Sequence, residues 1–337
     1  MKKLLFPLGF LVATLILASI SIFWWSENSK AVSSDTSFQD FLVVRGKSAS
    51  QIGEALYKQG LIKKPLAFKV YVQVSGKASK IQAGQFRISP SFTLTKVVDT
   101  LTNPPVEFWV TIPEGLRREE VVERFIKGLE LKDAVAVNFR QEFLDNSEGQ
   151  EGFLFPDTYL FPRTASGSAV VTKMTNTFDS EMIQFHTTLL DENAAGGLDN
   201  KGLVTLASII ERETKTNDER PVVAGILFNR LEIGMGLQAD ATVQYAAATA
   251  KCRVGIECDW WPVLTKDDLS INSPFNTYRF RGLPPAPIAS PGLSSIRAVI
   301  HPEETDYLYY LHDADGGIHY AKTLAEHNDN VKVYLGK

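Results

Sequence analysis

The sequence predicts an α+β protein, in which an N-terminal apolar helix precedes a small α+β module and a larger, mixed α+β C-terminal domain. Three observations lead to this fold class. An uncharged apolar run opens the chain, a strand–turn–helix pattern begins near Phe38 and recurs about 69 residues later, and a long buried-helix pattern lies in the C-terminal half. The 337 residues are enough for two domains with accessory segments.

The composition of the chain indicates which kinds of binding partner to expect. The chain is 44% hydrophobic and 22% charged, with a formal net charge of −4. Because no domain carries an excess of Lys and Arg, the sequence offers no footprint for phosphates, and we expect no nucleic-acid partner. A mildly acidic protein can still bind a neutral or zwitterionic polymer such as a glycan.

The first 25 residues predict a membrane anchor. A short basic start, Met1-Lys2-Lys3, precedes the apolar run Leu4–Trp25, which is long enough to cross a hydrocarbon core of about 30 Å as a helix. Trp24 and Trp25 lie where an interfacial aromatic belt is expected. The alternative is a cleaved signal peptide, whose apolar region is usually about 7–15 residues. We predict an uncleaved, single-pass anchor with the chain after Ser26 outside the cytoplasm.

Residues 26–37 are Ser-rich and predict a linker, and residues 38–105 predict a small module. The module opens with a strand over Phe41–Val44, a turn at Gly46 and an amphipathic helix, followed by a helix from Pro65 and a returning strand within Ile81–Ser89. This order, with the opening "VVRGKSASQIGEAL", resembles LysM-type glycan-binding modules. A plain scaffold that spaces the C-terminal domain from the membrane is the alternative.

The second strand–turn–helix pattern lies in residues 106–150, which we predict to be a second small α+β unit and connector. Gly115 occupies the place of Gly46, and Val121 that of Ile52. Pro104-Pro105 indicates a hinge between the two patterns. The remainder, Asp133–Gln150, is charged and shows no clear periodicity, and the C-terminal domain is predicted to comprise residues 151–337.

The stretch "LASIIERET" ends a predicted buried helix, Leu203–Thr214, with two acids one residue apart. At about 100° per residue, Glu211 and Glu213 both fall at the edge of the apolar face, whereas Arg212 points to the opposite side. Partial burial raises the pKa of a glutamate, so either acid is suited to proton donation. The alternative is a structural ion pair with Arg212, Arg220 or Lys215.

Polar side chains suited to sugar hydroxyls and acetamides follow this helix in three clusters. Small-ligand clefts combine such groups with apolar walls. The clusters supply Asn229, Arg230, Gln238, Asp240, Asn276, Thr277 and Tyr278.

Several collinear segments between Glu151 and Leu335 carry a resemblance to a known family. They read "EGFLFPDTYLF", "LASIIERET", "ILFNRLEIGMGLQADATVQYA", "SPFNTYRFRGLPPAPIASPG" and "HYAKTLAEHN". Together they resemble the YceG-like endolytic murein transglycosylases.

The resemblance implies a peptidoglycan lyase of the inner membrane, with a periplasmic catalytic domain that cuts nascent glycan strands internally. Glycan strands and peptidoglycan synthases are then the expected partners, and no cofactor or metal is expected. Glu213 matches the family's catalytic glutamate. The substrate-binding residues predicted with it are Glu211, Asn229, Arg230, Gln238, Asp240, Asn276, Thr277 and Tyr278.

The spacing of the two acids favours a mechanism with one carboxylate. Residues two apart on a helix do not face each other, so Glu211 and Glu213 are a poor acid–nucleophile pair across one bond. We expect Glu213 to protonate the oxygen between MurNAc and GlcNAc, then to deprotonate the MurNAc 6-hydroxyl, which leaves a 1,6-anhydro-MurNAc end. A muramidase with Glu211 or Asp240 as second acid, and a non-catalytic peptidoglycan-binding scaffold, are the alternatives.

Cys252 and Cys258 are the two cysteines of the chain. Two thiols without clustered histidines do not predict a zinc site. Outside the cytoplasm they are free to form a disulfide across a loop of about seven residues, and two unpaired cysteines in a surface insertion are the alternative. Both cysteines and Trp260-Trp261 lie in a longer loop, residues 246–268, which matches no feature of the family.

Overall fold

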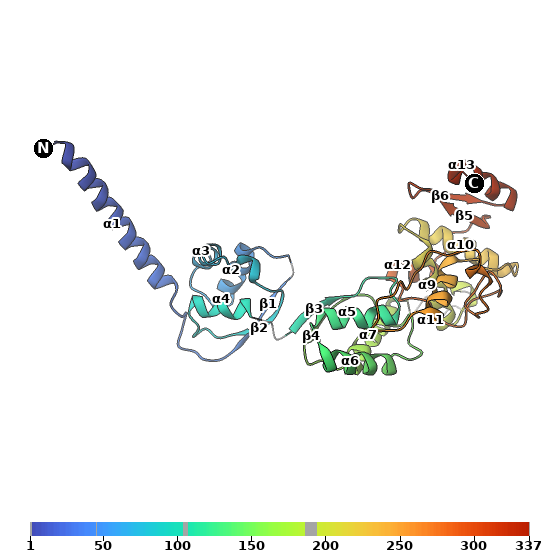
Figure 1. The fold of residues 1–337 in the computed structure, drawn as a ribbon, viewed down its shortest axis with the longest axis horizontal. Helices are drawn as coiled ribbons and strands as arrows, with labels where there is room; N and C mark the ends of the chain where they lie inside the picture. Colours follow the sequence, from blue (N-terminus) through green and yellow to red (C-terminus); the bar gives the residue numbers. More distant parts are fainter. Residues whose placement is uncertain (1, 45, 104–106, 186–193, 337) are drawn as a thin grey trace. The chain divides into compact units, whose positions relative to one another are not determined.

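The computed structural model describes residues 2–44, 46–103, 107–185 and 194–336, with side chains from residue 14 onward. The chain forms two compact units (Figure 1). The first comprises Met1–Trp109 with Leu160–Arg163, and the second Val110–Tyr159 with Thr164–Lys337. Residues 110–150, predicted as a separate connector, therefore belong to the same unit as the C-terminal domain.

Helix α1 (Lys2–Asn28) contains the apolar run that predicts a membrane anchor. The side chains of residues 2–13, which include ten of the 22 residues of that run, lie outside the described part of the chain. Among the side chains that are described, no helix is both long and apolar enough to cross a bilayer. At the end of the run, Trp25 packs on Tyr71 with ring centroids 5.4 Å apart. The anchor stays a prediction.

The first unit has the predicted order strand, helix, helix, strand. These elements are β1 (Gln39–Val43), α2 (Ala49–Lys58), α3 (Pro65–Val74) and β2 (Gly84–Ile88), with a 3₁₀ turn η1 (Ala78–Lys80) before β2 and a further helix α4 (Leu94–Thr102) after it. Strands β1 and β2 pair antiparallel, with Phe41 opposite Phe86. The order of elements is confirmed, whereas the glycan-binding function that it suggests stays a prediction.

Local sequence explains where the helices of this unit begin. Ser48 and Gln51 form a capping box at the start of α2, and Pro65 is at the first position of α3, where its missing N–H costs nothing. The helices bury one apolar face each against the β1–β2 pair. The shared core includes Phe41, Ile52, Leu56, Phe68, Phe86 and Val97.

The repeated strand–turn–helix pattern is confirmed as β3 (Glu107–Thr111) and α5 (Arg118–Gly128). Both turn glycines have a left-handed backbone, with φ of 83° at Gly46 and 75° at Gly115, which is why glycine occupies both turns. Strand order is β1-β2-β3-β4, with β4 at Thr158–Pro162. The predicted hinge, Pro104-Pro105, lies outside the described residues.

Helix α6 (Asp133–Asn146) forms where the sequence shows no clear period. Its buried residues are Ala136, Phe139 and Phe143, whereas Val135 and Val137 are exposed, so the apolar residues of the sequence do not follow one helical stripe. Helix α7 (Gly167–Met182) packs on α6 and passes into the 3₁₀ turn η2 (Ile183–Phe185). The last residues of the helix predicted over 170–190 lie outside the described part.

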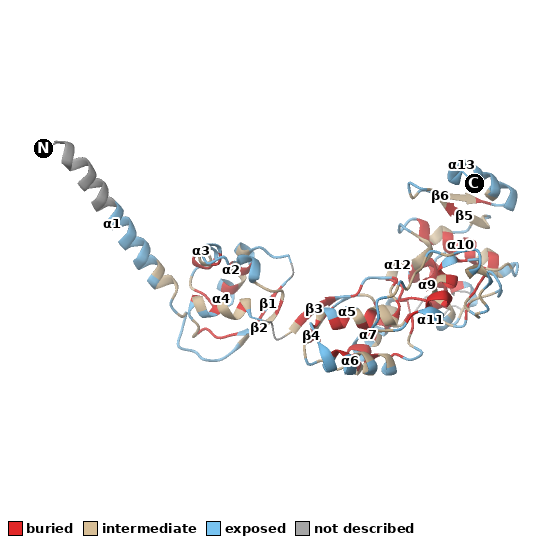
Figure 2. Cartoon of the chain, viewed as in Figure 1, coloured by how far each residue is buried: buried red, intermediate tan, exposed pale blue. Residues whose placement is uncertain are grey.

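Helix α9 (Asn200–Glu213) is the central helix of the second unit. It is buried over Leu203–Ile210 and packs against α10 (Glu219–Glu232), α11 (Asp240–Lys251) and α12 (Leu293–Ile300), as the red segments of Figure 2 indicate. Asp199 caps its first turn by accepting a 2.7 Å hydrogen bond from the Gly202 N–H. The predicted helices at 203–214 and 220–231 are confirmed.

The chain ends in a hairpin, β5 (Tyr309–His312) and β6 (Ile318–Ala321), with α13 (Leu324–Leu335) lying beside it in Figure 1. The connector that leads to β5 is fixed on α10. Asn229 donates to the carbonyl oxygens of Thr305 and Tyr307 over 2.7 and 3.1 Å. Two 3₁₀ turns, η3 (Ala194–Gly197) and η4 (Asp268–Ser270), complete the described elements.

Gly225→Ala tests how closely this connector must approach α10. A Cβ at position 225 would overlap the Glu303 carbonyl oxygen. We expect the variant to lower the free energy of unfolding by about 1–3 kcal/mol, measured by thermal and urea unfolding. Gly234→Ala is the control, because its φ is 64° but no atom lies near its Cβ, so only backbone strain of about 1 kcal/mol is added. Equal losses in the two variants would contradict the close approach.

Candidate active site

Glu213 is the last residue of α9, and its carboxylate is held by two donors. The Tyr310 hydroxyl donates to Oε2 over 2.9 Å, and the Ala241 N–H at the start of α11 donates to Oε1 over 3.4 Å. The donors come from β5 and α11, elements far from α9 in sequence. The carboxyl group therefore has a fixed orientation before any ligand arrives.

The surroundings of Glu213 favour its protonated form. Burial raises its pKa, and the charge of Asp240 raises it further, while the bonds from Tyr310 and Ala241 act in the opposite direction. The C-terminal end of a helix also carries partial negative charge, which disfavours a carboxylate there. Burial raises the pKa of Tyr310 well above its usual value as well, so its hydroxyl keeps its proton and remains a donor.

A pocket of about 550 Å³ opens over Glu213, which is partly exposed to it. Its walls come from the ends of α9 and α10, the start of α11, strand β5 and helix α13. The lining residues are Glu213, Arg230, Gln238, Asp240, Tyr278, Tyr309, Tyr310, Leu311, His312, Leu324, His327, Asn328, Val331 and Leu335. Its size is typical of a small-ligand site.

Asp240 and Tyr278 form the polar rim of the pocket. The Tyr278 hydroxyl donates to Asp240 over 2.7 Å, and burial, followed by the charge of Asp240, raises the pKa of Tyr278. Gln238 is exposed beside them and has a left-handed backbone, with φ of 49°. Because such a conformation is strained for a residue with a Cβ, its retention at a pocket edge is consistent with a functional position.

Arg230 brings a buried positive charge to the pocket. Its guanidinium donates to the carbonyl oxygens of Leu308, over 2.7 Å, and Leu237. It also lies 5.6 and 5.8 Å from the ring centres of Tyr309 and Tyr310. Its charge also lowers the pKa of Glu213, in opposition to burial. A guanidinium in this position can attract an anionic or strongly polar group.

Asn276 and Thr277 lie directly before Tyr278 but are fully buried. Asn276 donates to two carbonyl oxygens, those of Leu269 and Ile271, both over 2.9 Å. Thr277 Oγ1 accepts a 3.0 Å bond from the Ala239 N–H. Asn276 thus holds its own loop together, and Thr277 joins that loop, which carries Tyr278, to the segment that carries Gln238 and Asp240.

Glu211 faces a different region from Glu213. One carboxylate oxygen accepts from Arg220 over 2.8 Å, and the other accepts from the Gly292 N–H over 2.9 Å and the Ser295 hydroxyl over 2.7 Å. It therefore caps the N-terminus of α12 and forms an ion pair with Arg220, the structural alternative foreseen for one of the acids. Glu211 and Asn229 are not among the pocket-lining residues.

The sequence did not indicate Tyr310, Tyr309 or Asn328 as pocket residues, and His327 was not among the predicted site residues. Two segments could have indicated them: the aromatic strand "YLYYLH" at 307–312 and the family-like segment "HYAKTLAEHN". His327 stacks on Tyr309, with ring centres 5.3 Å apart, and burial lowers its pKa. Aromatic residues in strands usually pack in the core, so no local feature of the sequence distinguished these pocket residues from core residues.

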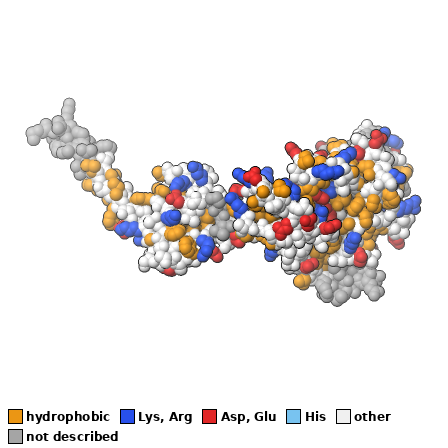
Figure 3. All heavy atoms as spheres, turned by 60° about the horizontal axis from the view of Figure 1, so that its bottom comes forward, with side chains coloured by type: hydrophobic (Ala, Val, Ile, Leu, Met, Phe, Trp, Pro, Cys, Tyr) orange, Lys and Arg blue, Asp and Glu red, His pale blue; other side chains and the backbone are white. Residues whose placement is uncertain are grey.

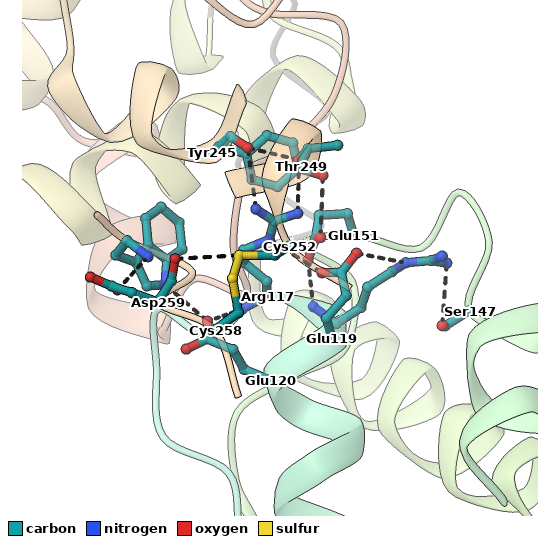
Figure 4. A network of polar contacts seen from close by, with 12 residues as sticks. Arg117, Glu119, Glu120, Ser147, Glu151, Tyr245, Thr249, Cys252, Cys258 and Asp259 are labelled. Atoms are coloured by element: carbon teal, nitrogen blue, oxygen red, sulfur yellow. Dashed lines mark hydrogen bonds and ion pairs between the residues drawn. A yellow bond between two sulfur atoms is a disulfide. The ribbon is translucent and has the colours of Figure 1, made fainter. Parts of the chain in front are cut away.

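A second enclosed acid, Glu151, lies in the network shown in Figure 4. Burial, with a contribution from the charge of Glu119, raises its pKa to about 8. It accepts a 3.1 Å bond from the Arg118 N–H and a 3.4 Å bond from Tyr245. Since it is not among the residues that line the pocket over Glu213, we assign it a structural position at the start of α5.

Cys252 and Cys258 form a disulfide, with Cα atoms 5.7 Å apart. The alternative of unpaired cysteines is thereby excluded. On the face shown in Figure 3, basic and acidic side chains are interspersed, in keeping with the small net charge.

The sequence pattern of the YceG-like family matches residues 41–333. An endolytic murein transglycosylase of Bacillus subtilis is 34% identical over 316 residues, which are 86% of this chain and 83% of that protein. One of Streptococcus pneumoniae is 25% identical over 87% of this chain and 58% of its own length. The crystal structure of a YceG-like protein from Listeria monocytogenes has a TM-score of 0.55 and 27% identity, covering 87% of this chain and 99% of that one.

The pH dependence of the stability of Glu213→Gln tests whether burial raises the pKa of Glu213. A raised pKa means that the folded state retains the proton, so the wild-type stabilisation is complete at low pH and is lost as pH rises through the raised value. The amide stays neutral throughout. We expect the melting temperature of Glu213→Gln, relative to wild type, to increase from pH 4 to pH 8.

Glu211→Gln is the matched control, because it removes the charge that pairs with Arg220. It should lower the melting temperature at pH 8. A constant difference between Glu213→Gln and wild type across the pH range would count against a raised pKa.

Proposed function

Because the chain belongs to the YceG-like family, we propose that it is an endolytic murein transglycosylase that cleaves peptidoglycan glycan strands between MurNAc and GlcNAc. The observation that carries the proposal is the position of Glu213, a carboxyl group that lines the pocket and whose pKa is raised by burial. A lytic transglycosylase needs one group that acts first as an acid and then as a base. Glu213 has the orientation and the raised pKa for both steps.

In the first step, the Glu213 carboxylic acid donates its proton to the oxygen that links MurNAc C1 to the next GlcNAc. The C1–O bond breaks, and the GlcNAc part leaves with a free 4-hydroxyl. The MurNAc C1 becomes oxocarbenium-like, and Glu213 is now a carboxylate. The hydrogen bonds from Tyr310 and Ala241 stabilise that charge.

In the second step, the Glu213 carboxylate takes the proton of the MurNAc 6-hydroxyl while that oxygen bonds to C1. The product is a 1,6-anhydro-MurNAc end, and Glu213 regains its proton. No water is consumed, so enclosure of the site is an advantage. Proton transfer by one positioned side chain contributes typically about 10²–10⁴-fold, and the remaining acceleration comes from holding and distorting the sugar.

The remaining pocket residues are suited to binding the strand. Asp240 and Tyr278 present acceptor and donor atoms to sugar hydroxyls, and Gln238 presents an amide at the rim. Arg230 carries the positive charge that complements the lactyl carboxylate or its peptide amide on MurNAc. Asn276 and Thr277 support this surface from behind.

A muramidase mechanism is the second candidate, because Asp240 places another carboxylate at the same pocket. It would make Asp240 the base that activates water, so product strands would carry reducing MurNAc ends. The hydrogen bond from Tyr278 occupies one oxygen of Asp240. Glu211 is not available for that role, because both its oxygens are bound to Arg220 and to the start of α12.

We further propose that residues 1–25 anchor the protein in the inner membrane, with both compact units in the periplasm. The uncharged run Leu4–Trp25 and the basic start support this topology. The strand–helix–helix–strand unit that follows then serves as a LysM-like glycan-binding module close to the membrane. New glycan strands emerge there, so peptidoglycan synthases are the expected protein partners and termination of strand elongation the expected role.

Mass spectrometry of digested, purified glycan strands tests the reaction. Wild type should release fragments ending in 1,6-anhydro-MurNAc, and Glu213→Gln should lose activity by at least about 10²-fold because it cannot donate a proton. Reducing MurNAc ends, together with an equal loss in Asp240→Asn, would identify a hydrolase. Full activity of Glu213→Gln on the strands would refute the assignment, and an inactive wild type that still pellets with sacculi would favour a scaffold.

Membrane attachment is tested by fractionation of cells that express the full chain or a chain without residues 1–25. The full chain should sediment with membranes and resist extraction by carbonate, because an uncharged segment of this length is retained in the bilayer. The shortened chain, directed to the periplasm by a cleavable signal, should be soluble. Release of the full chain without detergent would indicate that the segment is removed.

A further inference from the structure

Arg212, between the two acids of the helix end, is covered by an indole ring. Its guanidinium carbon lies 3.8 Å from the ring centre of Trp261, a close cation–π contact. It donates a long hydrogen bond, 3.4 Å from Nη1 to the Gly115 carbonyl oxygen, and the charges of Glu120, Glu211 and Glu213 act on it as well. Its Nε atom is buried without a hydrogen-bond partner. Trp261 therefore covers the Arg212 guanidinium, a contact that the sequence did not predict.

Trp261 is itself held firmly. Its indole N–H donates to Glu120 on α5 over 2.9 Å, and its backbone N–H donates to Asp259 over 3.0 Å. On its other side, Gln244 of α11 donates to the Pro262 carbonyl oxygen over 3.0 Å. The ring thus has a fixed position relative to two helices of the second unit.

Trp261 lies three residues after the short loop closed by the Cys252–Cys258 disulfide, which Figure 4 shows beside Arg117 and Glu120. Arg117 is fully buried and lies 4.7 Å from the ring centre of Trp260, the neighbour of Trp261. Trp260 and Trp261 therefore stack on different arginines. One contact ties the loop to the start of α5, and the other ties it to α9.

The opposite side of Arg212 is bounded by the Gly115 turn. A Cβ at position 115 would lie 3.4 Å from Arg212 Cδ, so the turn and the arginine are in direct contact. The turn is fixed by paired backbone bonds, from Gly115 N–H to Ser290 and from Ser290 N–H to Leu116, both 2.8 Å. Arg212 is enclosed between a fixed turn and a fixed ring.

These contacts immobilise the residue directly before Glu213. Successive helix residues point about 100° apart, so Glu211, Arg212 and Glu213 are held from three directions. A shift of Arg212 would rotate the last turn of α9 and move the Glu213 carboxyl relative to Tyr310. Misplacement of a catalytic group by about 1 Å can cost about 10²-fold in rate.

We propose that Trp261 is a positioning residue for the glycan-cleaving reaction, acting on Glu213 through Arg212. This inference rests on the proposed function, in which Glu213 is the acid and base. Trp261 does not line the pocket over Glu213. Its contribution should thus fall on the chemical step rather than on strand binding.

Steady-state kinetics of the full-length Trp261→Leu variant on soluble glycan strands provide the test. We expect kcat to fall about tenfold and KM to stay within twofold of wild type, at a temperature well below the melting points of both proteins. Trp261→Phe, which keeps an aromatic face but loses the bond to Glu120, should recover part of the loss. Trp260→Leu is the matched control, and we expect a lower melting temperature with kcat unchanged.

A double-mutant cycle tests the route through Arg212. If Trp261 acts through Arg212, then Arg212→Met should reduce kcat as much as Trp261→Leu, and the double variant should be no slower than either. Multiplying losses, or an equal fall of kcat in Trp260→Leu, would overturn the inference.

Glu213→Gln separates this inference from the proposed function. Wild-type kcat in Trp261→Leu together with an inactive Glu213→Gln would refute only the positioning role. An active Glu213→Gln would instead refute the proposed function on which the positioning role rests.

Discussion

The candidate site depends on the enclosure of one carboxyl group at the end of a buried helix. Glu213 is the last residue of α9, where the helix leaves the apolar core, so the environment of its carboxyl group disfavours charge. Two hydrogen-bond donors are nevertheless placed to stabilise the carboxylate form. Neither condition alone suits a group that must both give and take a proton. A fully apolar site would keep the proton, and a solvated site would have lost it before substrate arrived.

The surrounding structure can be understood as support for that carboxyl group. Helices α10, α11 and α12 pack around α9, and the β5–β6 hairpin brings Tyr310 over its end. The neighbouring acid, Glu211, joins α9 to α12 and Arg220. Arg212 joins it to Trp261. The sequence "ERE" thus combines the proposed acid and base, Glu213, with two residues that hold α9 to its neighbours.

Much of this fold follows from local sequence. The Gly46 and Gly115 turns and the apolar face of α9 predicted the correct elements, and family motifs indicated Glu213. Other features depend on tertiary contacts that no local pattern encodes. Tyr310 contacts Glu213 although 97 positions of the chain separate them. The apolar residues of α6 show no clear helical period. Asn276, Thr277 and Asn229 resemble polar cleft residues in the sequence, and only the structure shows that they bind backbone groups.

The protonation state of Glu213 is the most direct measure of this account. It can be followed by ¹³C NMR of protein labelled at the glutamate side-chain carboxyl carbon, with the Glu213 signal assigned from its absence in the Glu213→Gln spectrum. We expect a titration midpoint clearly above that of the exposed glutamates. A midpoint at or below the ordinary glutamate value would contradict it, because the carboxyl group would then have no proton to donate.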